Sequence, residues 1–170
     1  MIFEKATDRD IPQLLEIMET CYRGDTARKG WTHESDIVDG NRTTEALLLE
    51  EITVPGGNYL KYTNEDGKIV GCVYTVVNAE ENECFVGSLC VHPTIQSQGL
   101  GKKLMTAAED LARQAGCTKL CMKVLTTRTE LIAWYEKLGF KYIGQNFPFP
   151  KGCGIPKIPL ELGSWEKQLE

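Results

Sequence analysis

The chain has 170 residues, of which 42% are hydrophobic and 25% are charged. Values this close to those of average soluble proteins exclude collagen-like, low-complexity and wholly disordered chains, and the length predicts one domain over residues 1–170. The formal net charge is −5, from 19 Lys and Arg against 24 Asp and Glu, which argues against a nucleic-acid-binding domain.

The first half of the chain predicts a strand, two helices and then three strands. A strand over 2–5 is followed by a helix whose apolar positions, Ile11, Leu14, Leu15, Met18, Cys21 and Tyr22, share one helical face. A second helix covers 44–52 and stops at Pro55-Gly56-Gly57. Strands over 59–62 and 68–77 flank the turn residues 64–67, and a third strand over 84–91 ends before Pro93.

The second half begins with a long amphipathic helix after Gly99, which ends at Gly116. A strand over 119–125, a helix over 130–138 and a strand over 140–143 follow. Four prolines fall within 148–159, so we expect an ordered loop without regular structure there and an added edge strand over 158–162. The element order predicts an α/β (α+β) domain around a mixed sheet.

Targeting and metal-binding signals are weak in this chain. The acidic and polar N-terminus and the lack of a stretch of about 20 apolar residues predict a cytoplasmic protein with no signal peptide and no membrane span. The seven cysteines are odd in number and form no CxxC pair, which favours reduced thiols over a disulfide framework. Only two histidines occur, His33 and His92, so no metal site is expected.

The segment from Gln96 to Lys102 joins a strand to the long helix and carries two glycines, Gly99 and Gly101. Glycines let a ligand approach the backbone, and the free N–H groups of a helix's first turn suit a phosphate. Both common nucleotide motifs fail here. Position 104, where a dinucleotide fingerprint needs glycine, is Leu104, and position 103, where a Walker loop needs Ser or Thr, is Lys103. A turn that binds no ligand is the alternative.

Two further residues have both a functional and a purely structural interpretation. Gly87 lies inside a strand, where glycine marks a bulge or a close backbone approach, or only a small residue under a bulky neighbour. Tyr135 shares a helical stripe with apolar residues, so it is either a core aromatic or a functional hydroxyl.

Taken together, the motifs resemble the GNAT superfamily of acyl-CoA-dependent N-acetyltransferases. The matching segments are Val91-His92-Pro93, Gln96-Ser97-Gln98-Gly99-Leu100-Gly101 and, about thirty residues later, Tyr135-Glu136-Lys137-Leu138-Gly139-Phe140. The resemblance extends over nearly the whole chain. It implies a single domain with a mixed, mostly antiparallel sheet of six to seven strands, splayed between the fourth and fifth, and about four flanking helices.

The resemblance also implies a binding site for acetyl-CoA and needs no metal. The pantetheine arm would lie along the backbone of Leu89, Cys90 and Val91, beside Gly87. The pyrophosphate would lie on the turn formed by Gln96, Ser97, Gln98, Gly99, Leu100, Gly101 and Lys102. Tyr135 would face the thioester sulfur and protonate the departing thiolate. The family often carries Asn where this chain has Arg128, whose guanidinium could contact a CoA phosphate instead.

The acceptor would meet the polar stretch after the first helix, with Tyr22, Trp31, Glu34 and Arg42 as candidate binding residues. Glu34 would favour a cationic amine and Arg42 a carboxylate, so the acceptor is amino-acid-like or polyamine-like. The general base stays open between Glu83, Glu34 and a bound water, because a position where some relatives carry Glu holds Lys123.

The function that the resemblance implies is transfer of an acetyl group from acetyl-CoA to a primary amine of a small molecule. Acetylation of a protein N-terminus or lysine is an alternative within the same chemistry. A CoA-sensing module without turnover is an alternative of another class. We expect no nucleic-acid or membrane partner, and a homodimer is common among similar proteins.

Overall fold

The computed structural model describes residues 3–23, 27, 33–96 and 98–170. Short and long elements follow one another along the chain: β1 (Glu4–Lys5), η1 (Asp8–Asp10), α1 (Ile11–Tyr22), β2 (Val38–Asp39), α3 (Glu45–Thr53), β3 (Gly57–Thr63), β4 (Ile69–Asn78), β5 (Glu83–Val91), η2 (Pro93–Ile95), α4 (Leu100–Gln114), β6 (Lys119–Leu125), α5 (Thr129–Lys137), β7 (Lys141–Pro148), β8 (Ile155–Pro156) and β9 (Glu161–Gln168).

The main sheet has seven strands in the order β1-β3-β4-β5-β6-β9-β7. Every neighbouring pair in it is antiparallel except β5 and β6, which run parallel. The mixed, mostly antiparallel sheet is therefore confirmed. A separate pair is formed by β2 and β8, in which Val38 lies opposite Pro156.

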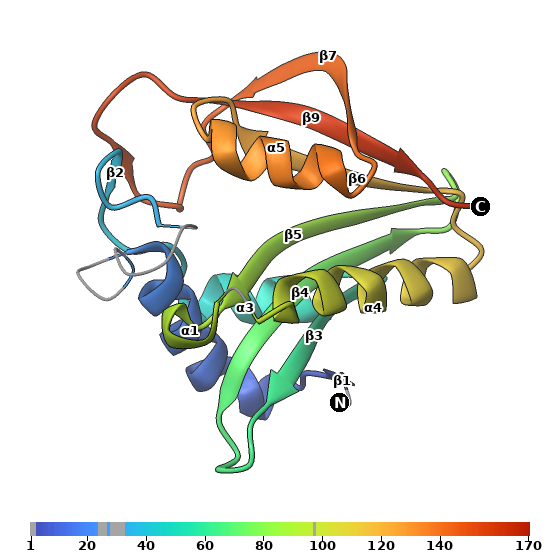
Figure 1. The fold of residues 1–170 in the computed structure, drawn as a ribbon. Coiled ribbons are helices and arrows are strands. Elements are labelled where there is room, and N and C mark those ends of the chain that lie inside the picture. The colour runs from blue at the N-terminus through green and yellow to red at the C-terminus, as the bar shows by residue number, and fades with distance from the viewer. Residues whose placement is uncertain (1–2, 24–26, 28–32, 97) are drawn as a thin grey trace.

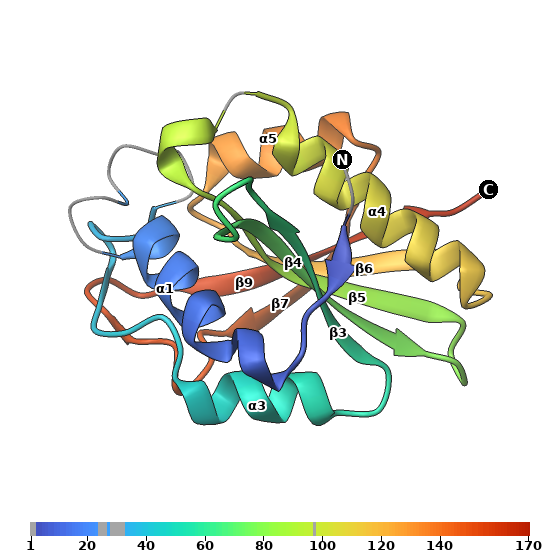
Figure 2. The same cartoon turned by 90° about the horizontal axis from the view of Figure 1, so that it is seen from below.

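Helices cover both faces of the main sheet (Figure 2). On one face, α1 and α3 pack through Leu14, Met18 and Leu48, all nearly inaccessible to solvent. On the other face, α4 contributes Leu104 and Met105, and α5 packs beside it. The apolar stripes predicted for the first helix and the long helix are thus the surfaces that bury against the sheet.

The sheet opens between its fourth and fifth strands, β5 and β6, as Figure 1 shows. Their pairing covers only Glu83 to Phe85 of β5, opposite Lys119 to Cys121 of β6, although β5 continues to Val91. The predicted splay is confirmed at this position. Past Phe85 the facing edges of β5 and β6 are no longer joined to each other, and side chains from elsewhere enter the space between them.

A β-bulge lies in β5 where the splay begins. Cys72 pairs with Cys90 and Tyr74 with Gly87, so two steps along β4 match three along β5. The residue after Gly87, Ser88, has a positive φ of 48°, which is uncommon for a residue other than glycine. The structure shows the bulge, and it also places Gly87 against a bulky neighbour, because a Cβ there would lie 3.0 Å from the Phe85 ring.

The C-terminal strands differ from the sequence-based expectation. The strand expected over 158–162 at the sheet edge begins at Glu161, continues to Gln168 and lies inside the sheet, between β6 and β7. The edge strand is β7, which is longer than the predicted 140–143. The position of β9 was mispredicted because its only large apolar residue after Leu162 is Trp165, which is 5% exposed. The proline-rich loop also contains β8, a short strand.

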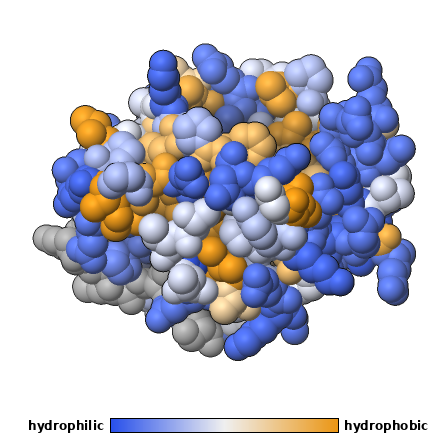
Figure 3. Space-filling model, turned by 90° about the horizontal axis from the view of Figure 1, so that it is seen from above, coloured by the Kyte–Doolittle hydropathy of each residue, from blue (hydrophilic) through white to orange (hydrophobic). Residues whose placement is uncertain are grey.

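The outer surface is polar with separate hydrophobic patches, as the face in Figure 3 shows. The large exposed apolar side chains are Leu49, Val54, Tyr142, Ile143, Ile155 and Ile158. Within the described ranges, none of the helices has the length and apolar character that crossing a membrane requires. The same part of the chain contains no group of three or more potential metal ligands.

Candidate active site

The N-terminal end of α4 adjoins an open cavity of about 420 Å³, here called the first cavity. Gly99 precedes the helix with a φ of 79°, a conformation that costs glycine little and lets the chain turn sharply from η2 into α4. The N–H groups of the first turn lack acceptors within the helix, and the helix dipole is positive at this end. The lining residues are Leu89, Val91, Gln96, Gly99, Leu100, Gly101, Lys102, Glu130, Ala133, Trp134 and Lys137.

The first cavity suits an anionic ligand. Two lysines, Lys102 and Lys137, and one carboxylate, Glu130, line it together with the helix terminus. A side chain at Gly101 would have its Cβ 3.7 Å from the ring of Trp134, so α4 and α5 approach each other closely here. Helix N–H groups and lysines around one cavity are a typical setting for phosphate groups.

Hydrogen bonds hold the turn that leads into α4. The Gln96 side chain donates to the Val91 carbonyl at 2.8 Å, and the backbone N–H of Thr94 donates to the His92 ring at 3.3 Å. Gln96 therefore shapes the turn and lines the cavity. Gln98 is exposed and is not part of the lining, and Ser97 lies outside the described residues.

A second cavity of about 390 Å³ occupies the space where β5 and β6 separate. It is lined by Tyr22, Glu34, Arg42, Glu51, Tyr74, Phe85, Val86, Gly87, Ser88, Leu89, Met122, Lys123, Val124, Leu125, Arg128, Leu131, Tyr135, Phe147, Pro148, Phe149, Pro150, Cys153 and Leu162. Leu89 lines both cavities. The two cavities therefore meet at the β5 bulge.

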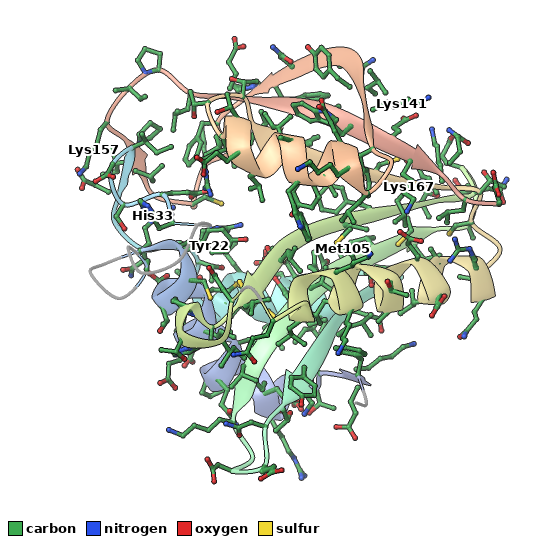
Figure 4. The ribbon with its side chains drawn as sticks, in the orientation of Figure 1. Tyr22, His33, Met105, Lys141, Lys157 and Lys167 are labelled. Atoms are coloured by element: carbon green, nitrogen blue, oxygen red, sulfur yellow. The ribbon has the colours of Figure 1, made fainter. Side chains whose placement is uncertain are left out.

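The bulge is held from the side of α1. The Tyr22 hydroxyl donates to the Leu89 carbonyl at 2.6 Å, and the Cys72 thiol donates to the Ser88 carbonyl at 3.9 Å. Cys90 is fully buried in the core beneath α1, so its side chain enters neither cavity. Leu89 and Val91 point toward α4 and α5 instead. Figure 4 shows Tyr22 and His33 at the end of the sheet where β5 and β6 lie apart.

Tyr135 comes from α5 and is 7% exposed, with its ring packed edge-on against Trp134 and Phe140. Burial raises the pKa of its phenol, the nearby Cys90 raises it further, and the charge of Arg128 opposes this shift. A phenol is already protonated at neutral pH at its ordinary pKa of about 10, and the raised pKa makes this one a weaker acid than a solvated tyrosine. In the described part of the chain this hydroxyl has no hydrogen-bond partner, so it is free to donate to a ligand in the second cavity.

Glu34 lies between two arginines. Its Oε2 is 2.6 Å from Nη1 of Arg23 and its Oε1 is 3.6 Å from Nη1 of Arg128, and all three side chains are at most 12% exposed. Both carboxylate oxygens are thus engaged. Arg128 lines the second cavity and not the first, so the structure places it with Glu34 rather than beside the α4 terminus where phosphates would lie.

Arg42 also enters the second cavity. Among the described residues its guanidinium directly contacts neutral groups, and the carboxylates of Glu34 and Glu51 interact with its charge from farther away. Its Nη2 is 3.4 Å from the Ser88 hydroxyl and its Nη1 is 3.9 Å from the Cys153 sulfur. The guanidinium carbon lies 4.9 Å from the centre of the Tyr22 ring. The backbone N–H of Arg42 donates to Glu19 at 2.7 Å, which fixes where the side chain begins.

Glu51, on α3, is a carboxylate of this cavity that sequence reasoning missed. Burial raises its pKa above the ordinary value of 4.5, while the Tyr59 hydroxyl and the charge of Arg42 lower it. The Tyr59 hydroxyl donates to Oε2 at 2.6 Å. A glutamate near the end of an ordinary amphipathic helix gives no motif, and only the packing of α3 on the sheet shows that it lines the cavity.

The structure thus brings Tyr22, Glu34 and Arg42 together with Tyr135 around one cavity. Trp31, the fourth predicted acceptor residue, lies outside the described residues. Glu83, a candidate base, is not in either cavity; it pairs with Lys119 at 3.2 Å, near the start of β5. Lys123 lines the second cavity with its ammonium 4.0 Å from the centre of the Phe147 ring.

Comparisons with known proteins agree with this geometry. The model of the acetyltransferase (GNAT) family matches residues 11–140. The amino-acid acetyltransferase of Mannheimia succiniciproducens is 31% identical over 80% of this chain, but the match spans only 26% of that enzyme. The uncharacterized N-acetyltransferase YjgM of Escherichia coli is 28% identical, with 84% of this chain and 83% of that protein covered.

Solved structures share the fold. The ribosomal-protein-S18-alanine N-acetyltransferase of Escherichia coli has a TM-score of 0.73, with 99% of this chain and 94% of that chain covered. Its sequence identity is 18%, so this likeness concerns the fold alone.

Replacing Glu34 tests the ion pairs that this residue makes with Arg23 and Arg128 beside the second cavity. The Glu34→Gln variant leaves Arg23 and Arg128 without their shared carboxylate, and losing one partner of a buried ion pair typically costs about 3 kcal/mol or more. We expect the free energy of unfolding, measured by urea denaturation, to fall by about that amount. Glu65→Gln, in an exposed turn, is the control and should change it by less than about 0.5 kcal/mol. Equal stabilities of the two variants would contradict the assignment of Glu34 to stabilising ion pairs.

Proposed function

Because this chain belongs to the GNAT family of acetyltransferases, we propose that it transfers the acetyl group of acetyl-CoA to a primary amine of a small molecule. The observation that carries the proposal is the meeting of two cavities at Leu89. One of them suits phosphate groups, and the other is lined by a protonated tyrosine and by charged side chains. A donor in the first cavity and an acceptor in the second would meet at the β5 bulge.

The residues around the first cavity fit acetyl-CoA. The N–H groups at the start of α4 would hold its phosphates, with Lys102 and Lys137 supplying positive charge. Leu89 and Val91 would flank its pantetheine arm. Acetyl-CoA supplies an acyl group already activated as a thioester, so this chain's own residues need to orient the acceptor and move protons.

Tyr135 is the proposed acid. When the amine nitrogen bonds to the thioester carbon and the carbon–sulfur bond breaks, the thiolate needs a proton, and the Tyr135 phenol donates one. The position of this hydroxyl in the second cavity, without a protein partner in the described chain, supports the assignment. The same features favour an enzyme over a CoA-sensing module without turnover.

Glu51 is the proposed base. An alkylammonium must lose a proton before it can attack, and a carboxylate with a raised pKa is a better proton acceptor than an ordinary one. Glu34, the other carboxylate of this cavity, has both oxygens engaged by arginines. The proton therefore passes from the ammonium to Glu51, directly or through a water molecule.

The size of the second cavity favours a small acceptor over a protein. Its volume is about 390 Å³, which lies within the range of about 300 to 1,000 Å³ typical of small-molecule sites. Residues 147–150 and Cys153, which follow or end β7, contribute to its wall.

Thermal-shift measurements test the cofactor site. Acetyl-CoA at one hundred times its dissociation constant stabilises a protein by about 2.7 kcal/mol, which raises the melting temperature of a domain this size by roughly 5 to 10 °C. We expect this shift with acetyl-CoA and CoA but not with ATP or NADPH at matched concentrations.

Two adjacent lysines provide variants for the same measurement. Lys102→Glu places a negative charge in the first cavity and should reduce the shift at least by half. Lys103→Glu, on the same turn but outside the lining, should leave the shift unchanged. The absence of a shift with either CoA species would remove the basis for the proposed function.

The Tyr135→Phe variant tests the acid. It removes a hydroxyl without a protein partner in the described chain and leaves the ring packing in place, so we expect at least a tenfold loss in kcat and nearly unchanged acetyl-CoA affinity. Tyr62→Phe, on β3 outside both cavities, is the control. If Tyr135→Phe turns over as fast as the wild type, another group protonates the departing thiolate.

The Glu51→Gln variant tests the base through both activity and stability. Loss of a general base typically lowers kcat about a hundredfold or more. Because the folded-state pKa of Glu51 is raised above 4.5, its ionisation disfavours the folded state as the pH rises past that value. The melting temperature of Glu51→Gln relative to wild type should therefore increase between pH 4 and pH 8. An unchanged kcat would reject Glu51 as the base, and a pH-independent difference would reject its raised pKa.

A further inference from the structure

The charges around the second cavity are not balanced. Three cationic side chains line it, from Arg42, Lys123 and Arg128, against the two carboxylates of Glu34 and Glu51. Glu34 is also paired with Arg23, a further cation just behind the wall. The lining therefore has an excess of positive charge, which disfavours a polycationic acceptor and leaves room for an anion.

Among the three cations of the second cavity, Arg42 is the one available to bind an anionic ligand. Within the described chain, its guanidinium has no carboxylate within ion-pair distance, and its neighbours are a hydroxyl, a thiol and an aromatic ring. A guanidinium has five N–H donors in a planar fork that matches the two oxygens of a carboxylate. A shielded positive charge with few partners is costly unless a ligand supplies the missing anion.

The position of Arg42 limits the distance between the acceptor's anion and its amine. The guanidinium contacts Ser88 at 3.4 Å, and Ser88 directly precedes Leu89, where the two cavities meet. The acceptor amine must reach that same junction to attack the thioester. An anion held by Arg42 is therefore only a few bonds away from the amine.

Apolar side chains from several elements make up much of the remaining lining of the second cavity. They include Phe85, Leu131, Phe147, Phe149 and Leu162. A side chain carried by the acceptor would pack against these residues, and an apolar one loses the least hydration there.

We propose that the acceptor is an amino acid with its carboxylate close to its amine and with an apolar side chain, and that Arg42 binds the carboxylate. This inference rests on the proposed function and specifies its substrate class. Such an acceptor is amino-acid-like and not polyamine-like. Glu34, which would have attracted a second ammonium, is already neutralised by arginines.

Three acceptors of one shape separate the alternatives. Phenylalanine carries the carboxylate, phenylalanine amide replaces it with a neutral amide, and phenethylamine lacks it. We expect kcat/KM for phenylalanine to exceed that for either of the others at least tenfold, although the amide has the less basic and more readily deprotonated amine. Equal or higher values for the amide would overturn the inference and would favour a peptide N-terminus as acceptor.

Variants of Arg42 test whether this residue causes the preference for an acceptor with a carboxylate. Arg42→Gln should reduce kcat/KM for phenylalanine at least thirtyfold, and that for phenethylamine less than threefold. Arg42→Lys keeps the positive charge but lacks the planar fork of N–H donors. Its kcat/KM for phenylalanine should therefore lie between those of the wild type and Arg42→Gln. Arg9→Gln, an exposed arginine outside both cavities, is the matched control. If Arg42→Gln keeps the wild-type preference for the carboxylate, Arg42 does not bind it.

A binding measurement keeps the inference separate from catalysis. By calorimetry, the folded wild type should bind N-acetylphenylalanine at least tenfold more tightly than N-acetylphenethylamine, and Arg42→Gln should remove this difference. No acetyl-CoA thermal shift and no turnover of any amine would count against the proposed function. Turnover of all three acceptors at similar rates, with no difference in product binding, would reject the carboxylate site alone.

Discussion

The extra residue in β5 is the constraint on which the candidate site depends. Side chains alternate between the two faces of a strand, so an inserted residue exchanges the faces of everything after it. Cys84 and Val86 pack toward α4 before the bulge, and Leu89 and Val91 do so after it. Without the insertion, Cys90 would point toward α4 and Leu89 toward α1. The bulge therefore decides which side chains the two cavities share.

The bulge lies where β5 loses its partner β6, and α1 compensates for part of that loss. The Tyr22 hydroxyl donates to the Leu89 carbonyl at 2.6 Å, and the Cys21 thiol donates to the Val91 carbonyl at 3.3 Å. Consecutive residues at the end of one helix thus satisfy alternate carbonyls of one strand. Buried carbonyl groups need such partners, and their supply from α1 keeps the splayed strand in one conformation with its edge open.

Sequence patterns predicted the elements whose signals are local. The apolar stripe of the long helix, the turn at Gln96 to Gly101 and the strand that ends before Pro93 all lie in short stretches of sequence, where periodicity and glycine placement are informative. The glycine inside the strand predicted over 84–91, Gly87, also indicated a bulge as one of its two interpretations. By contrast, β9 was misplaced because its central Gly163 and Ser164 give little strand signal, and its position inside the sheet depends on long-range pairing.

Charged residues of the site were harder to predict, because partners far apart in sequence determine what each one does. Glu34 lines the second cavity together with Tyr22 and Arg42, two other predicted acceptor residues, but its pairing with Arg23 and Arg128 could not be deduced from any spacing. The same holds for Glu51, whose burial depends on how α3 packs beneath Tyr59 and Tyr74.

Arg23 has a consequence for how this protein's selectivity can change. Besides Glu34, its guanidinium donates to the Gly40 carbonyl at 3.1 Å and to the Cys153 carbonyl at 2.6 Å. One side chain thus joins the end of α1, the segment before α3 and the C-terminal loop. A substitution in any one of these segments that moves its backbone also disturbs the other two. New acceptor preferences are therefore expected to arise from exchanges of side chains on this fixed frame, or from coordinated replacements in all three segments, rather than from the lengthening of a single loop.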